Sequence, residues 1–137
     1  MFIDQPDEFS ERWAPTVIAI LRIVTALLFI EHGTAKLLGF PVVPQIAYPP
    51  MWSMYWIAGV LELVGGLLLL VNRFVPLGLV LLGPVIVNIL LYHLFLNPAG
   101  IGLAIFVTIL WFIVFYGHRQ YFSGIFAQHT AVNQSGV

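Results

Sequence analysis

The sequence contains no cysteine, and few of its residues carry a charge. Without cysteine the chain cannot form disulfides, iron–sulfur or thiolate zinc sites, or a covalent c-type haem, so any redox chemistry needs a bound cofactor. Charged residues make up 8% of the 137 residues and hydrophobic residues 61%, whereas soluble domains contain about 25% charged and about 45–50% apolar residues. This composition indicates an integral membrane protein surrounded by the lipid bilayer. The net charge of −1 provides no basic surface for nucleic acid.

Apolar segments follow one another along nearly the whole chain. A membrane-spanning helix needs about 20 residues, and we expect four such helices over about residues 13–38, 51–71, 74–96 and 98–116. Open sheets cannot exist in lipid, and no ten-residue alternation indicates a barrel. The sequence therefore predicts an all-α protein, a four-helix antiparallel transmembrane bundle that forms a single domain over residues 1–137.

The basic residues predict how the bundle is oriented. With four spans, Arg12, Arg73 and Arg119 fall at ends on one side of the membrane, and Lys36 falls on the other. Because loops rich in lysine and arginine remain in the cytoplasm, both termini are expected there.

Two charges of opposite sign are expected at the same depth of the first two helices. Arg22 lies nine residues after Trp13 (22 − 13), and Glu62 lies nine residues before Val71 (71 − 62). At 1.5 Å per residue both would be about 13 Å from the cytoplasmic helix ends. We therefore predict an interhelical ion pair between Arg22 and Glu62, either functional or simply holding two helices together.

A second group of polar side chains is expected near the outer surface. By the same counting His32 and His93 each lie nineteen residues into their helices (32 − 13 and 93 − 74), about 28 Å along. Arg22, His32 and Lys36 share one face of the first helix, and Glu31 is turned about 100° aside. The sequence thus predicts an outer polar cluster of Glu31, His32, Lys36, His93 and Asn97. In the structural alternative, Lys36 extends to lipid phosphate and the two histidines stabilise helix ends. We expect no metal site.

The first two helices carry a recognisable pattern. In "LRIVTALLFIEHGTAKLLGF" an arginine stands ten residues before a His-Gly pair, and a lysine follows that glycine by three residues. Together with "GVLELVGGLLLL", this segment resembles the DoxX family of small four-helix bacterial and archaeal membrane proteins. The resemblance maps the family's arginine, histidine, glycine, lysine and second-helix acid onto Arg22, His32, Gly33, Lys36 and Glu62.

The resemblance implies a location in the inner (plasma) membrane and a redox function. Members of the family are associated with thiosulfate:quinone oxidoreductase, in which the DoxD and DoxA chains act together, and with membrane complexes that handle redox stress. We therefore expect a multi-pass subunit that binds a quinone or hydrophobic redox partner within the bundle, beside a soluble or membrane redox partner subunit. Glu62 and His32 would transfer protons. The ligand site would contain Arg22, Glu31, His32, Lys36, Glu62 and His93.

Three other functions are compatible with the residues alone. A small proton-coupled carrier would use Glu62 as its proton-exchanging group, and a structural or assembly subunit would use the polar pairs only to hold helices. Haem b, with His32 and His93 as axial ligands, is disfavoured because such bundles need two facing imidazoles and a wide slot. Homo-oligomers are permitted by the large lipid-facing surface of four short helices.

Overall fold

The computed structural model describes residues 8–38 and 52–126, and all regular structure within these ranges is helical. Four α-helices and two short 3-10 helices follow one another: α1 (Glu8–Leu38), α2 (Trp52–Leu70), α3 (Val75–Phe95), η1 (Pro98–Gly100), α4 (Ile101–Gly117) and η2 (Arg119–Phe126). The predicted all-α class is confirmed. The proline-rich segment between the first two helices lies outside the described residues.

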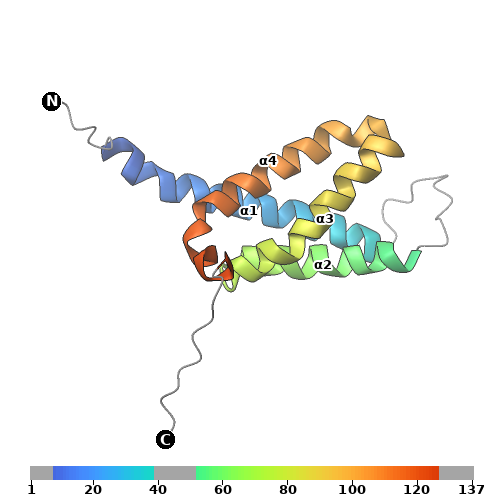
Figure 1. The fold of residues 1–137 in the computed structure, drawn as a ribbon, viewed down its shortest axis with the longest axis horizontal. Helices are drawn as coiled ribbons and strands as arrows, with labels where there is room; N and C mark the ends of the chain where they lie inside the picture. The colour runs from blue at the N-terminus through green and yellow to red at the C-terminus, as the bar shows by residue number, and fades with distance from the viewer. Residues whose placement is uncertain (1–7, 39–51, 127–137) are drawn as a thin grey trace, which may run out of the picture.

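The four helices form a bundle in which each is antiparallel to the next (Figure 1). α1 packs against α2 and α4, and α3 packs against the same two helices, so α1 and α3 occupy diagonal positions. The N-terminal turns of α1 project beyond the other helices (Figure 1). α1 begins at Glu8, five residues before the predicted start, whereas the observed bounds of α2 and α3 agree with the predicted ones to within one residue.

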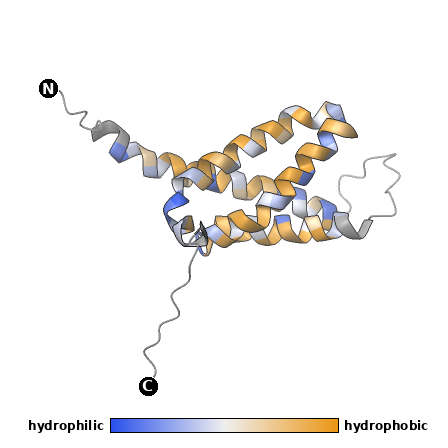
Figure 2. Ribbon diagram, viewed as in Figure 1, coloured by the Kyte–Doolittle hydropathy of each residue, from blue (hydrophilic) through white to orange (hydrophobic). Residues whose placement is uncertain are grey.

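The helices have the composition of membrane spans. Among the described residues, three are long and apolar enough to cross a bilayer, over Glu11–Leu38, Val75–Phe95 and Pro98–Gly117. The apolar part of α2, Tyr55–Leu70, is shorter. Figure 2 shows apolar residues along all four, with hydrophilic residues near helix ends. Many large hydrophobic side chains face outward, among them Leu27, Leu77 and Phe106 at 50% exposure or more. Such a surface is stable in contact with lipid, so the protein is embedded in a bilayer.

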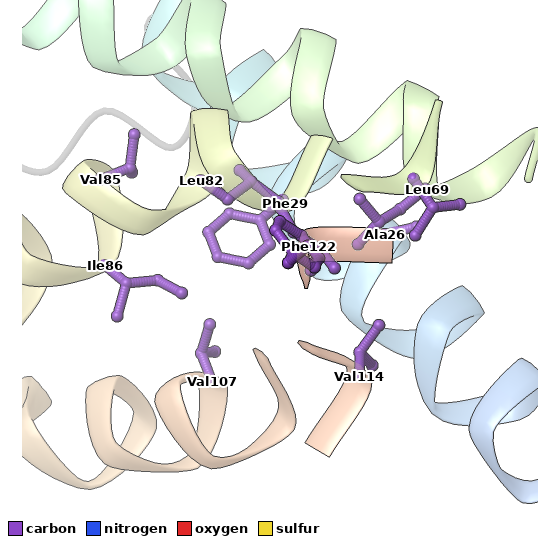
Figure 3. Packing of buried hydrophobic residues seen from close by; sticks show 11 residues of the cluster. Ala26, Phe29, Leu69, Leu82, Val85, Ile86, Val107, Val114 and Phe122 are labelled. Atoms are coloured by element: carbon purple, nitrogen blue, oxygen red, sulfur yellow. The ribbon is translucent and has the colours of Figure 1, made fainter. Parts of the chain in front are cut away.

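The interior of the bundle is filled by apolar side chains from every helix (Figure 3). Phe29 of α1, Leu69 of α2, Leu82 of α3 and Val114 of α4 are almost completely buried. Phe122 of η2 also enters this core, where its ring centroid lies 4.7 Å from that of Phe115. The segment after α4 therefore folds back against the bundle.

Glycines allow α1 and α2 to approach backbone to backbone. A Cβ atom on Gly33 would lie 2.7 Å from the carbonyl oxygen of Gly59 and 2.7 Å from the amide nitrogen of Leu63. Further along the same contact, a Cβ atom on Gly66 would lie 3.0 Å from the carbonyl oxygen of Ala26. Small residues at helix contacts are typical of membrane proteins, in which close packing replaces the hydrophobic drive between helices.

Substitution of Gly33 by alanine is expected to disrupt this contact. The new methyl group would overlap backbone atoms of α2, which cannot rotate away, so the free energy of unfolding should fall by about 1–3 kcal/mol. Gly102→Ala is the matched control, because a Cβ atom there meets nothing within 4 Å, and it should be neutral or stabilising by about 0.5–1 kcal/mol. Unfolding in detergent by titration with SDS measures both, and equal stabilities would contradict the proposed role of Gly33.

Candidate functional site

A buried ion pair joins α1 to α2. Glu62 is completely buried, and its Oε1 atom accepts a hydrogen bond from Nζ of Lys36 over 2.5 Å. The Lys36 side chain is 14% exposed, and its ammonium also lies 5.5 Å from the ring centroid of Tyr55. Intramembrane charges are costly unless they are paired, and here the carboxylate and the ring stabilise the ammonium.

The glycine contact positions this pair. Lys36 follows Gly33 by three residues, so both lie on the face of α1 that meets α2. A Cβ atom on Gly59 would lie 3.0 Å from Cβ of Lys36, and Glu62 follows Gly59 by three residues on α2. The short interhelical distance thus brings the lysine stem alongside α2 and its ammonium onto the carboxylate.

The second oxygen of the Glu62 carboxylate is an unused hydrogen-bond acceptor. Oε2 of Glu62 is buried and has no hydrogen-bond partner among the described residues. An ionised carboxylate accepts several hydrogen bonds, and buried polar atoms are seldom left without one. This atom is therefore the place in the bundle where an additional donor group would bind most favourably.

The predicted ion pair between Arg22 and Glu62 is wrong. The NH1 group of Arg22 donates instead to the backbone carbonyl of Leu69 and, over 3.4 Å, to that of Leu70. These residues lie two helical turns beyond Glu62 along α2. The prediction assumed that Trp13 and the end of α2 lie at one level, but the first turns of α1 project past α2 (Figure 1).

Arg22 has a structural task at the end of α2. The last carbonyl groups of a helix have no partner within it, and the guanidinium of Arg22, a residue that is 8% exposed, supplies donors to them. The turn into α3 follows at once, with Asn72 and Phe74 both in the left-handed region at φ 55° and 54°. Since a bulky residue is seldom found there, the turn depends on contacts such as that of Arg22.

The predicted outer cluster is divided into separate contacts. Nδ1 of His32 lies 3.0 Å from the carbonyl oxygen of Leu28 and 2.9 Å from Oε2 of Glu31, and both side chains are more than a third exposed. No hydrogen bond or ion pair joins either residue to Glu62 or His93 within residues 8–38 and 52–126. The prediction of one cluster is wrong because α1 and α3 are diagonal in the bundle.

His93 stabilises the turn between α3 and α4. Its Nδ1 atom lies 2.9 Å from the carbonyl oxygen of Asn97, and its ring packs edge-on against Tyr92. The ring also covers Gly100, where a Cβ atom would lie 2.1 Å from its Cε1 atom. These contacts agree with the structural alternative for His93. In the described part of the chain, no group of three potential ligands could hold a metal ion.

Neither the contact between Lys36 and Tyr55 nor the binding of Arg22 by backbone carbonyl groups is predicted from the sequence. The nearness of Tyr55 to Lys36 depends on the register of α1 against α2. The glycines could have supplied that register, because Gly33 and Gly59 must meet where the backbones are closest.

The likeness to known proteins extends over the two helices that carry the ion pair. The family model described as DoxX matches residues 17–94, more than half of the chain. The chain belongs to the DoxX family. It is also similar to a Haemophilus influenzae protein named "Uncharacterized protein", with 38% identity over 93 residues, or 67% of each chain. No solved structure matches the chain. The matched DoxX region contains Arg22, Lys36 and Glu62.

Double-mutant cycles distinguish the observed partner of Glu62 from the predicted one. In this DoxX protein, Glu62→Leu or Lys36→Met alone should lower the free energy of unfolding by about 3 kcal/mol, because each leaves a buried charge alone. The two changes together should cost about 1 kcal/mol or less. Arg22→Met combined with Glu62→Leu should instead be additive within about 0.5 kcal/mol.

SDS titration of the purified variants measures these energies. Coupling between Arg22 and Glu62 that exceeds the coupling between Lys36 and Glu62 would contradict the observed register.

Proposed function

We propose that this DoxX protein is a membrane subunit of a quinone-linked oxidoreductase system, which holds a quinone head group or a similar hydrophobic redox partner at Lys36 and Glu62. The observation that supports this function is the buried ion pair with an unpartnered carboxylate oxygen. Ligand sites of this kind have apolar walls and a few polar groups that fix orientation. Within the described residues, the pair supplies both a cation and an acceptor inside an otherwise apolar bundle.

Reduction of a quinone requires two electrons and two protons for each molecule of quinol formed. The electrons would come from a partner chain that carries the sulfur or electron chemistry, because this chain contains no cysteine. One of the two protons would pass through Lys36 and Glu62 to the quinone oxygen at the pair, and His32, partly exposed on the adjacent turn of α1, would exchange it with the surface. The other proton would reach the second quinone oxygen from outside the pair. Arg22 would contribute indirectly, by holding the end of α2.

The same proposal includes the placement of the protein in the cell. We place it in the inner (plasma) membrane of a bacterium or archaeon, with both termini in the cytoplasm. The end of α1 that carries Arg12 and the short α2–α3 turn that carries Arg73 would then face the cytoplasm. The site at Lys36, near the other end of α1, would lie toward the outer face, with a redox partner or second copy of the chain beside it.

Quinone binding is expected to depend on the ion pair. The purified full-length protein should retain quinone after extraction in mild detergent, and a quinone with a ten-carbon tail should raise its melting temperature. Lys36→Met/Glu62→Leu should abolish that shift, because both polar groups of the site are removed while the helix contact is kept. Glu11→Gln, an exposed position on the projecting end of α1, is the matched control and should bind normally.

If no quinone co-purifies and excess quinone stabilises neither protein, this function is excluded.

A proton-coupled carrier is the second candidate. The observation that favours it is that Glu62 is paired with a lysine and not with Arg22. A lysine ammonium in a protein can release its proton, whereas a guanidinium does not. A buried Lys36–Glu62 pair could therefore exchange one proton between its two members. This exchange is the elementary step that a carrier would couple to solute movement.

Proton flux into vesicles tests the carrier. Protein reconstituted in liposomes with an internal pH-sensitive dye should equilibrate an imposed pH gradient, and Glu62→Gln should abolish this flux because an amide does not exchange the proton. Glu11→Gln should leave the flux unchanged. Equal flux in empty liposomes, the wild type and Glu62→Gln would exclude the carrier. Failure of both the quinone and the flux experiments would leave the structural or assembly subunit as the function.

A further inference from the structure

The ion pair offers a ligand two different polar groups side by side. Nζ of Lys36 has three N–H donors, of which one is used by Oε1 of Glu62 and the ammonium also faces the Tyr55 ring. Oε2 belongs to the same carboxylate and is an acceptor without a partner in the described part of the chain. A donor and an acceptor thus lie next to each other, and one small ligand group can contact both once a side chain at the pair moves.

A hydroxyl group satisfies both polar groups of this arrangement, whereas a carbonyl oxygen satisfies only the ammonium. A hydroxyl can accept a hydrogen bond from the ammonium and donate its own proton to Oε2. A carbonyl oxygen can only accept, so it would satisfy the ammonium but leave Oε2 buried, unpartnered and facing another electronegative atom. Sites built to bind a hydroxyl strongly reject ligands that lack one, because buried polar groups are then left unpaired.

From this geometry we infer that the Lys36–Glu62 pair selects the reduced, hydroxyl-bearing form of a quinone, the hydroquinone, over the oxidised form. The inference rests on the proposed function, which it deepens by naming the redox state that the site prefers. It applies to the ionised carboxylate, the form that accepts the hydrogen bond from the Lys36 ammonium. The site would therefore be occupied chiefly by the product of quinone reduction or the substrate of quinol oxidation.

The ligand would approach along Lys36. Its side chain is 14% exposed, whereas that of Glu62 is completely buried. Contact with Oε2 thus requires a side-chain movement at the pair, and such rotamer changes are common on binding.

Three ligands with the same ten-carbon tail test the inference: a quinone, its hydroquinone and the dimethyl ether of that hydroquinone. The ether has the size of the hydroquinone but no donor, so it separates hydrogen bonding from shape. Calorimetry under anaerobic conditions with the purified full-length protein should give a Kd for the hydroquinone about tenfold or more below the Kd of either other ligand.

Variants assign this preference to Oε2. Glu62→Gln places an amide at the carboxylate, so the ratio between quinone and hydroquinone should fall to about one or reverse. Lys36→Met/Glu62→Leu, which leaves no lone charge, should lose the preference together with most of the affinity and covers the case in which the single variant does not fold. Glu11→Gln should keep the full ratio.

The outcomes separate the two proposals. Equal or tighter binding of the quinone, with affinity still dependent on the pair, would overturn the redox-state preference while the quinone site remained. Equal binding of the hydroquinone and its dimethyl ether would overturn it as well, because the hydroxyl proton would then have no role. Absence of binding by all three ligands would overturn the proposed function and this inference with it.

Discussion

The close contact between α1 and α2 is the constraint on which the rest of the site depends. Lipid provides no hydrophobic drive that brings two apolar helices together, so the contact depends on packing and on interhelical polar groups. Gly33 and Gly59 let the two backbones meet, because any side chain at Gly33 would occupy the position of α2 backbone atoms. Only at this separation can the ammonium of Lys36 reach Glu62 while both are withdrawn from lipid.

Most of the fold could be predicted from the sequence, because it depends on properties of single segments. Length and hydropathy identify four helices. The burial of Glu62 agrees with the local pattern, in which Gly59 and Gly66 lie three and four residues away on the same helix face. These features need no knowledge of how one helix is placed against another.

The register of the helices could not be obtained in the same way. Counting from helix ends assumes that ends lie at one depth, and the projecting start of α1 breaks this assumption by about two turns (Figure 1). Arg22 consequently meets the end of α2, and Lys36 lies beside Glu62, where Arg22 was expected. The order of helices around the bundle was equally open, so residues of α1 and α3 were grouped although the two helices are diagonal.

Arg22, which is buried, and Lys36, which is partly buried, differ in the kind of partner that they bind. Arg22 has a planar group with several fixed donors, and the carbonyls of Leu69 and Leu70 accept from it. Lys36 is a compact charge with rotatable donors, and its partner Glu62 retains an unused oxygen. A contact with no spare acceptor stabilises the fold. A contact with one spare acceptor in an apolar interior gains most from a ligand, which is why the proposed function is assigned to Lys36 and Glu62.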